Sequence, residues 1–166
     1  MLEPYAPWLL LANLPYNITF PILYRLQAYR LLFTEGVLMM QDEVAQKIIQ
    51  TSGRGYGFPS LFLQHYFTWK LLRKVPPDSF YPAPNVMSRL VHVAPIADPE
   101  HIPYEGAFWH FVQVCFTRPR KTLRNNLKRA GYPCDIFATE TLDLRAQQMN
   151  KQRFITLWKD IYQHLL

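Results

Sequence analysis

Several features of secreted, zinc-binding and membrane proteins are missing from this sequence of 166 residues. Its two cysteines, Cys115 and Cys134, show no CxxC spacing and no disulfide framework, which is typical of a reducing compartment. The five histidines show no zinc-ligand spacing. Uninterrupted apolar runs such as Trp8–Ala12 are too short to span a membrane, and Met1–Pro4 does not resemble the start of a signal peptide.

Acidic residues are also absent from Gly106–Cys134, a segment that contains six basic residues. The other twelve basic residues are matched by twelve acidic ones, so the whole net charge of +6 lies in this segment. A concentrated basic patch predicts a polyanionic partner, and a solvated helix face is the alternative. The six basic residues are Arg118, Arg120, Lys121, Arg124, Lys128 and Arg129.

The first part of the sequence has the pattern of an α/β protein. Trp8–Ala12 is a continuous apolar run, which predicts a parallel strand covered on both faces. We expect a helix capped by Thr19, a second apolar strand at Gly36–Met40, and a helix capped by Asp42. This alternation of strands and helices predicts a parallel sheet.

The second part begins after a proline-dense loop, Val75–Val86, and an alternating segment, Met87–Val93. Together these two segments predict a hairpin at a sheet edge. Beyond the linker Ala94–Pro103 the pattern becomes helical, so we expect an α/β domain at residues 1–97 and a helical domain at residues 98–166.

Three helices are expected in the second domain. Arg120, Arg124 and Lys128 would share one face of the middle helix, and Asn150 would cap the last. Apolar residues at helical spacing form the inner face of the first helix and of the last. They are Phe108, Phe111, Val112, Cys115 and Phe116 in the first, and Phe154, Leu157, Trp158, Ile161 and Leu165 in the last.

The tetrapeptide Asn13-Leu14-Pro15-Tyr16 follows the first strand, where ligands bind in open α/β sheets. The Asn13 amide can accept and donate hydrogen bonds, Pro15 stiffens the loop, and the Tyr16 ring offers a surface for stacking a base. These groups suit the exocyclic amine of a nucleobase, with S-adenosylmethionine as the methyl donor. A plain loop with a buried aromatic residue is the alternative.

Asn13–Ile18 resembles the Asn-Leu-Pro-Tyr motif of the ribosomal RNA adenine dimethyltransferases. Other segments resemble this family in the same order, namely Met39–Ile48, Val75–Val91, Cys115–Lys128 and Leu144–Asn150. The resemblance implies an α/β fold, the C-terminal half of a Rossmann-like S-adenosylmethionine-dependent methyltransferase sheet, followed by a small all-helical domain.

The resemblance also implies a reaction and its residues. The reaction dimethylates two adjacent adenines near the 3′ end of small-subunit rRNA. Asn13 would contact the cofactor and the target amine, Leu14 would contact the cofactor, and Pro15 would offer its carbonyl to the amine. Tyr16 and Phe80 would stack on the adenine, and the six basic residues would bind phosphates. The implied protein is a cytoplasmic or organellar monomer that binds small-subunit rRNA or a precursor ribosomal particle and no membrane.

Part of the family pattern has no counterpart in this sequence. In the family, a glycine-rich cofactor loop and an acidic ribose contact precede the strand that carries Asn-Leu-Pro-Tyr. Gly53–Gly57 reads G-x-G-x-G, but it follows a predicted helix rather than a strand, so we do not expect it to bind the cofactor. We expect an incomplete S-adenosylmethionine site and a truncated chain that is inactive alone. The alternative is a non-catalytic RNA-binding or ribosome-assembly module.

Overall fold

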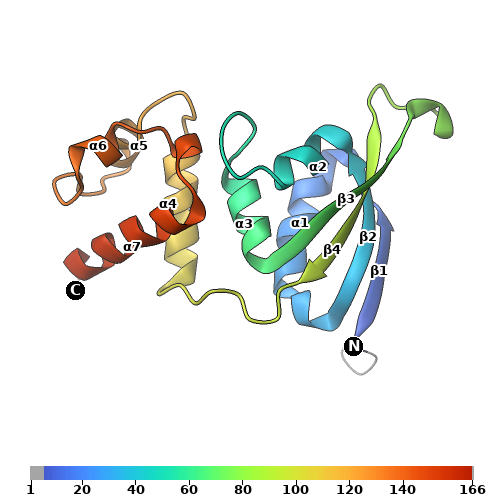
Figure 1. Ribbon diagram of the computed structural model, residues 1–166, viewed down its shortest axis with the longest axis horizontal. Coiled ribbons are helices and arrows are strands. Elements are labelled where there is room, and N and C mark those ends of the chain that lie inside the picture. Colours follow the sequence, from blue (N-terminus) through green and yellow to red (C-terminus); the bar gives the residue numbers. More distant parts are fainter. Residues whose placement is uncertain (1–5, 166) are drawn as a thin grey trace. The chain divides into compact units, whose positions relative to one another are not determined.

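The computed structural model describes residues 6–165, which form two compact units (Figure 1). The first unit comprises the residues up to Ile49 together with Phe62–Pro99, and the second comprises Gln50–Leu61 and the residues from Glu100 on. The strands are β1 (Trp8–Asn13), β2 (Phe33–Gln41), β3 (Phe67–Val75) and β4 (Ser88–Pro95). The helices are α1 (Thr19–Ala28), α2 (Asp42–Ile48), α3 (Phe58–Tyr66), α4 (Glu105–Phe116), α5 (Leu123–Arg129), α6 (Thr139–Leu142) and α7 (Lys151–Leu165).

The first unit contains a four-stranded sheet in the order β1-β2-β4-β3. β1 pairs with β2 in parallel, whereas β4 is antiparallel to both β2 and β3. The predicted α/β class is confirmed, but the predicted parallel pairing holds only for β1 and β2. The sheet is mixed because β3 and β4 form the hairpin that was expected at the sheet edge.

The two faces of this sheet differ in their cover. The helices α1, α2 and the last part of α3 lie over one face of the sheet (Figure 1). Leu38, Met40, Val91 and Val93 share one face by their alternation and pairing, and all four are fully buried, so theirs is the covered face. On the other face of β1, Leu9 and Leu11 are 74% and 84% exposed. The expectation that the first strand is covered on both faces is therefore wrong for the part of the chain that the structure describes.

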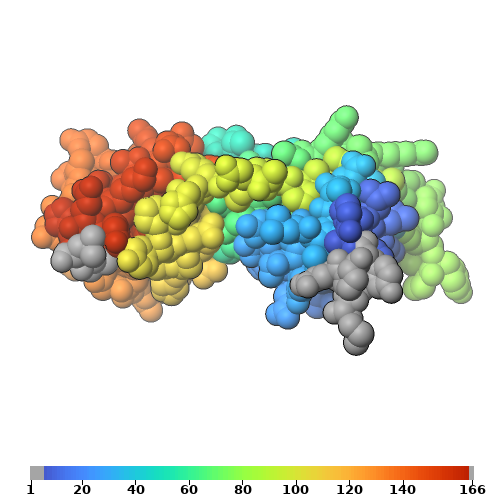
Figure 2. Space-filling model, turned by 90° about the horizontal axis from the view of Figure 1, so that it is seen from below, coloured from blue at the N-terminus to red at the C-terminus, as the bar shows by residue number. Residues whose placement is uncertain are grey.

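The proline-rich loop, residues 76–87, connects β3 to β4. Ser88 at the start of β4 is paired with Val75 of β3 and Gln41 of β2, so the loop stands at the carboxyl ends of β2 and β3. The turn that follows Asn13 lies at the same end, because β1 runs parallel to β2 with Asn13 beside Met39. In the space-filling view the loop, in light green, projects from the first unit (Figure 2).

In the second unit, α4 buries the predicted apolar face around Phe108, Phe111 and Cys115. The Asn150 side chain caps α7 by accepting a hydrogen bond from the Arg153 N–H at 3.0 Å, as predicted. The apolar stripe of α7 is buried from Phe154 to Ile161, and the side chain of Leu165 lies outside the described residues. The loop before α3 also belongs to this unit, where the Gly53 N–H donates to the Gln147 carbonyl at 2.9 Å.

The middle helix is shorter than predicted. α5 begins only at Leu123, so Arg120 lies in a turn and does not share a helix face with Arg124 and Lys128. The Thr122 backbone is extended (φ −70°, ψ 164°), so the helix does not continue back through Thr122 to Arg120.

Within residues 6–165, no helix combines the length and apolarity that crossing a membrane requires. In the same range, no three His, Cys, Asp or Glu side chains come together in a way that could hold a metal ion.

Candidate functional site

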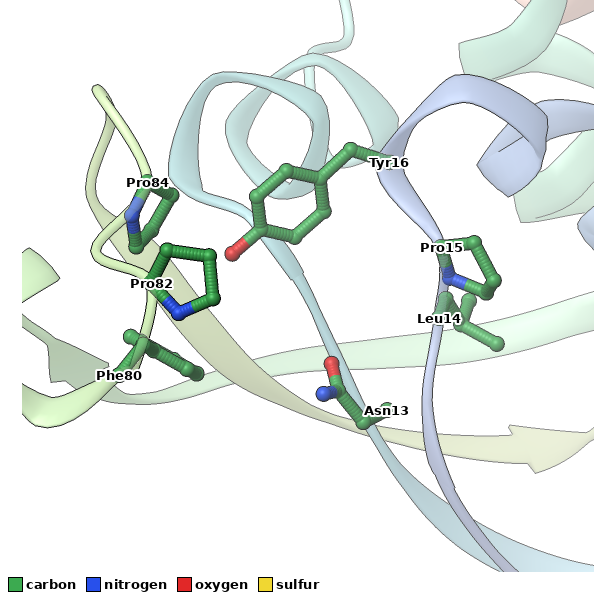
Figure 3. A pocket seen from close by; sticks show the side chains of 7 residues that line it. All are labelled: Asn13, Leu14, Pro15, Tyr16, Phe80, Pro82 and Pro84. Carbon is green, nitrogen blue, oxygen red and sulfur yellow. The ribbon is translucent and has the colours of Figure 1, made fainter.

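One pocket in the first unit is lined by all five residues that the sequence predicts to contact the target base or the cofactor. It has a volume of about 320 Å³ and lies between the turn after β1 and the proline-rich loop (Figure 3). The Asn13 amide and the Phe80 ring point into the space between these two segments, and the Tyr16 ring extends from the turn toward the loop. The lining residues are Asn13, Leu14, Pro15, Tyr16, Phe80, Pro82 and Pro84.

Backbone hydrogen bonds fix the turn. The Leu14 N–H donates to the Met39 carbonyl at 2.9 Å, which extends the pairing of β1 with β2 beyond the end of the strand. The Pro15 carbonyl accepts from the Ile18 N–H at 3.2 Å and from the Thr19 hydroxyl at 3.0 Å. Both lone pairs of that oxygen are then engaged, since a carbonyl has two. Among the described residues, no group donates to the Leu14 carbonyl.

These bonds affect two expectations. The Thr19 hydroxyl does not cap α1, because it donates back to the Pro15 carbonyl and Thr19 is itself the first residue of the helix. The predicted role of the Pro15 carbonyl, as acceptor for a bound amine, competes with two donors of the protein. The Leu14 carbonyl does not face this competition within the described chain.

Asn13 is the last residue of β1 and is exposed. Its side-chain amide has no hydrogen-bond partner in the part of the chain that the structure describes. One acceptor oxygen and one donor nitrogen are therefore available to a ligand in the pocket.

The two aromatic residues of the pocket come from opposite sides. Tyr16 is half-buried, and its hydroxyl shares a hydrogen bond with the hydroxyl of Ser88 at the start of β4. Phe80 is half-buried and lines the pocket, whereas its neighbour Tyr81 is fully exposed and does not. The choice of Phe80 over Tyr81 as the pocket aromatic thus agrees with the geometry.

A charged cluster supports the base of the proline-rich loop. The Asp42 N–H donates to the Met87 carbonyl at 2.9 Å, and the Asp42 carboxylate accepts from Arg89, from Gln46 at 2.8 Å and from Lys74 at 3.2 Å. Burial by itself would raise the pKa of Asp42, but the hydrogen bonds from Arg89, Lys74 and Gln46 hold it below its usual value. The charged carboxylate therefore ties together the ends of β2, β3 and β4.

The chemistry available in the pocket follows from its lining. No carboxylate or imidazole is among the described lining residues, which offer an amide, rings and backbone groups. Such a pocket favours a neutral planar group that stacks on aromatic rings and donates hydrogen bonds to oxygen atoms. The described lining residues are therefore suited to positioning a bound group, and none of them is a strong general base.

The basic segment lies in the second unit. Its members in the turn before α5 and at the end of that helix are exposed. Arg124 donates to the Asp143 carboxylate at 3.2 Å, a partner that the sequence pattern does not indicate. For Arg118, Arg120, Lys121, Lys128 and Arg129, the described residues provide no ion pair.

Asn126 organises this segment. It is 4% exposed, and its side-chain N–H groups lie 3.0 Å from the Cys115 carbonyl and 3.3 Å from the carbonyls of Arg118 and Thr122. These bonds hold the turn that carries Arg118, Arg120 and Lys121 against the end of α4. Leu123 and Leu127 are fully buried, so α5 has the packed side and the polar side that its pattern predicts.

The sequence did not reveal four residues that shape the two sites: Thr19, Ser88, Asn126 and Asp143. A threonine before a helix is an ordinary cap signal, and neither a serine at the start of a strand nor an asparagine within a basic segment carries a motif. Each acquires its role from a partner that folding brings close. The sequence predicted Asp42 as a helix cap, and this is wrong, because Asp42 is the first residue of α2 and the helix has no side-chain cap hydrogen bond.

Comparisons with known proteins agree with this geometry. The family model described as "Ribosomal RNA adenine dimethylase" matches residues 2–163. Among curated relatives, "Ribosomal RNA small subunit methyltransferase A" of Chlorobium limicola is 38% identical over 160 residues, which cover 95% of this chain and 59% of the relative. The protein of the same name from Syntrophotalea carbinolica is 34% identical, with 96% of this chain and 64% of the relative covered.

Two solved structures share the fold. A dimethyladenosine transferase from Plasmodium falciparum superposes with a TM-score of 0.79 at 21% identity, covering 97% of this chain and 70% of its own. The 23S rRNA methyltransferase ErmE gives a TM-score of 0.67 at 18% identity, with 94% and 66% covered. The chain spans about 60% of the length of the curated relatives that it matches.

Proposed function

The chain belongs to the ribosomal RNA adenine dimethylase family, and from this premise we propose that it forms the target-base pocket and an RNA-binding segment of an rRNA adenine dimethyltransferase. The proposed substrate is a pair of adjacent adenines near the 3′ end of small-subunit rRNA, presented in the RNA alone or in a precursor ribosomal particle. The observation that carries the proposal is the single pocket lined by Asn13, Leu14, Tyr16 and Phe80.

The reacting group in this proposal is the exocyclic amine of adenine. It is a poor nucleophile, because its lone pair is delocalised into the ring. The Asn13 side-chain oxygen and the Leu14 carbonyl are two neighbouring acceptors without a described protein donor, so they are suited to bind the two N–H bonds. Holding both bonds favours a pyramidal nitrogen whose lone pair points at the methyl group. The amine loses its proton after the transfer, which agrees with a pocket without a strong base.

The proposed base lies between the rings of Tyr16 and Phe80, which come from two segments of the first unit. To enter, the adenine has to leave its stack, which costs less in a single-stranded loop than in a duplex. Stacking on each aromatic ring contributes about 1–3 kcal/mol for each base in single-stranded complexes. The rings thus offset the loss of stacking in the RNA.

S-adenosylmethionine supplies the electrophilic methyl group in this proposal. Of the described residues, Asn13 and Leu14 are the ones that we expect at the edge of the cofactor, and the free donor of the Asn13 amide fits such a contact. The glycine-rich loop Gly53–Gly57 is held in the second unit and follows a helix, so it does not fit a cofactor loop.

The RNA backbone is the proposed partner of the basic segment. Phosphate contacts hold and orient RNA without reading its sequence, which suits exposed arginine and lysine side chains on a turn and a short helix. Because Arg124 already pairs with Asp143, it would contribute less than Lys128, which has no described partner.

The test uses an RNA hairpin with two adjacent adenines in its loop, one of them replaced by the fluorescent base 2-aminopurine. This base keeps the purine rings but carries its amine at C2 instead of C6, so it reports stacking and not the amine contacts. We expect the chain to bind this RNA and to quench the fluorescence, because stacking on Tyr16 and Phe80 quenches the base. Phe80→Ala should remove most of the quenching. The matched control is Tyr81→Ala, which removes the neighbouring ring that does not line the pocket, and it should keep the quenching.

The alternative function, a non-catalytic RNA-binding module, predicts a different result. In that case the RNA binds in a salt-dependent way, but the fluorescence does not respond to Phe80→Ala. Replacing Arg120, Arg124 and Lys128 together by glutamine should make the slope of log K against log[salt] less negative by about two under either function. An unchanged slope would mean that the basic segment is only a solvated surface.

A further inference from the structure

The Ser88 side chain is fully buried, although serine is a polar residue. Its hydroxyl shares a hydrogen bond with the hydroxyl of Tyr16, which lies 72 positions earlier in the sequence. Ser88 begins β4 and is paired with Gln41 of β2 on one side and Val75 of β3 on the other. The hydroxyl therefore projects from backbone that is held on both sides, which makes it a rigid anchor.

Apart from the hydrogen bond to Ser88, the Tyr16 ring is fixed only by its covalent link to its own backbone. It belongs to a short turn, Tyr16–Ile18, and is half-buried, so without a second point of attachment its plane is free to tilt. Stacking depends on the orientation of the ring as well as on its presence. A hydrogen bond at the far end of the ring fixes the plane before a base arrives, which lowers the entropy that binding would otherwise lose.

A purely structural role for this bond is the alternative. The turn already has three other attachments, namely the Leu14 N–H to the Met39 carbonyl and the two bonds to the Pro15 carbonyl. The hydroxyl bond is thus not needed to hold the backbone, and the part of Tyr16 that it fixes is the ring that lines the pocket. We propose that Ser88 is a positioning residue that sets the plane of the Tyr16 ring for stacking on the target base.

This inference rests on the proposed function, but its first test does not need RNA. The chain is labelled with 3-fluorotyrosine, and the Tyr16 signal among the ten tyrosines is assigned by its absence in Tyr16→Phe. In Ser88→Ala we expect the ¹⁹F resonance of Tyr16 to move toward the position of a mobile, solvent-exposed tyrosine. The other nine resonances should stay in place, which also shows that the variant is folded.

The second test measures quenching and affinity with the 2-aminopurine hairpin. Ser88→Ala and Tyr16→Phe each remove one half of the same hydrogen bond, and each should weaken binding of the stacked base about threefold to tenfold. The double variant should lose no more than either single variant, because the two side chains act as one unit. Tyr16→Phe keeps the test valid if Ser88→Ala does not fold.

Thr68→Val is the matched control. It also removes a hydroxyl from the β3–β4 pair, one that donates to the Ala94 carbonyl at 3.2 Å, at the other end of the strands from Ser88. It should change neither the Tyr16 resonance nor the quenching. Losses that add in the double variant, or a Tyr16 resonance that does not move in Ser88→Ala, would overturn the inference. Absence of quenching by the unmodified chain overturns the proposed function instead, and the ¹⁹F result distinguishes the two failures.

Discussion

The two faces of the four-stranded sheet are built from alternate residues of the same strands, and they differ in how far other segments cover them. The covered face buries Leu38, Met40, Val91 and Val93 completely. The other face exposes Leu9 and Leu11 and carries a hydrogen bond between the His92 ring and the Glu35 carboxylate at 2.8 Å. Both faces of β1 are apolar in sequence, but the described residues cover only one of them (Figure 1).

This difference shows what apolar patterning specifies and what it does not. A continuous apolar run indicates that both faces of a strand favour burial. Other segments of the protein, however, have to cover those faces. We expect an exposed apolar surface of this kind to favour association with another apolar surface. The same difference in exposure separates the Asp42–Arg89 ion pair from the His92–Glu35 contact. The Asp42 and Arg89 side chains are 12% and 14% exposed, whereas that of Glu35 is 56% exposed.

The largest expected loss of stability comes from a substitution on the covered face. Leu38→Ala should lower the free energy of unfolding of the first unit by about 3 kcal/mol, because it leaves a cavity at a fully buried position. Leu11→Ala, at an 84% exposed position of the other face, should change it by less than about 0.5 kcal/mol. Urea unfolding followed by circular dichroism measures both. Equal losses would mean that the two faces are covered alike.

Removing the buried ion pair between Asp42 and Arg89 should cause the second-largest loss of stability. Asp42→Asn should cost about 2 kcal/mol at pH 7, because Arg89 loses its charged partner in a mostly buried place. Glu35→Gln, which alters the exposed contact with His92, should cost less than about 0.5 kcal/mol.

The same Asp42 variant predicts a pH dependence. The pKa of Asp42 is lower in the folded chain than in the unfolded one, so its stabilisation is present above the unfolded pKa and is lost as the pH falls through the folded pKa. The advantage of the unmodified chain over Asp42→Asn should therefore shrink below about pH 4. A constant difference down to pH 2 in urea titrations would contradict this assignment.

Gly36→Ala probes the contact between β1 and β2. A Cβ atom there would lie 2.7 Å from both the Cβ and the carbonyl oxygen of Leu10, so the two strands would have to separate. We expect a loss of about 1.5 kcal/mol and faster amide exchange in β1. Gly106→Ala in α4 is the control, since no atom lies within 4 Å of the added methyl, and it should be neutral or stabilising by up to about 1 kcal/mol.

The smallest effect on stability is expected for Leu11→Lys. The free energy of unfolding should change by less than about 0.5 kcal/mol, because the side chain is exposed. Concentration-dependent association and binding of an apolar dye should both fall, since the charge interrupts the apolar surface of β1. Sedimentation velocity measures the first and dye fluorescence the second, and no change in either would show that this face is not an association surface.

Much of the fold was predictable from local pattern. The apolar run before Asn13, the alternation before Pro95 and the helical spacing of Phe108–Phe116 each correspond to an element of the structure. Phe67–Val75 is a strand whose pattern did not distinguish strand from helix, because its residues are only partly buried. The hairpin prediction implies that β4 is antiparallel to β3, but the position of β4 between β2 and β3 depends on pairing between distant segments, which a single segment does not encode.

The candidate site divides in the same way. The sequence named Asn13, Leu14, Pro15, Tyr16 and Phe80, and these residues line one pocket. It did not show that the Pro15 carbonyl is occupied by Ile18 and Thr19, nor that Ser88 holds the ring of Tyr16. Hydrogen bonds between distant residues leave no periodic signal in a sequence.

What the sequence alone determined is the set of chemical groups and their order along the chain, namely an amide, a stiff turn, two aromatic rings and a block of cations. The tertiary structure decided which of these groups meet and which remain available to a ligand. It pairs Arg124 with Asp143 and brings residues 13–16 to residues 80–84. The physical reason is that side-chain chemistry is local to each residue, whereas competition for hydrogen bonds and cover depends on neighbours that only folding supplies.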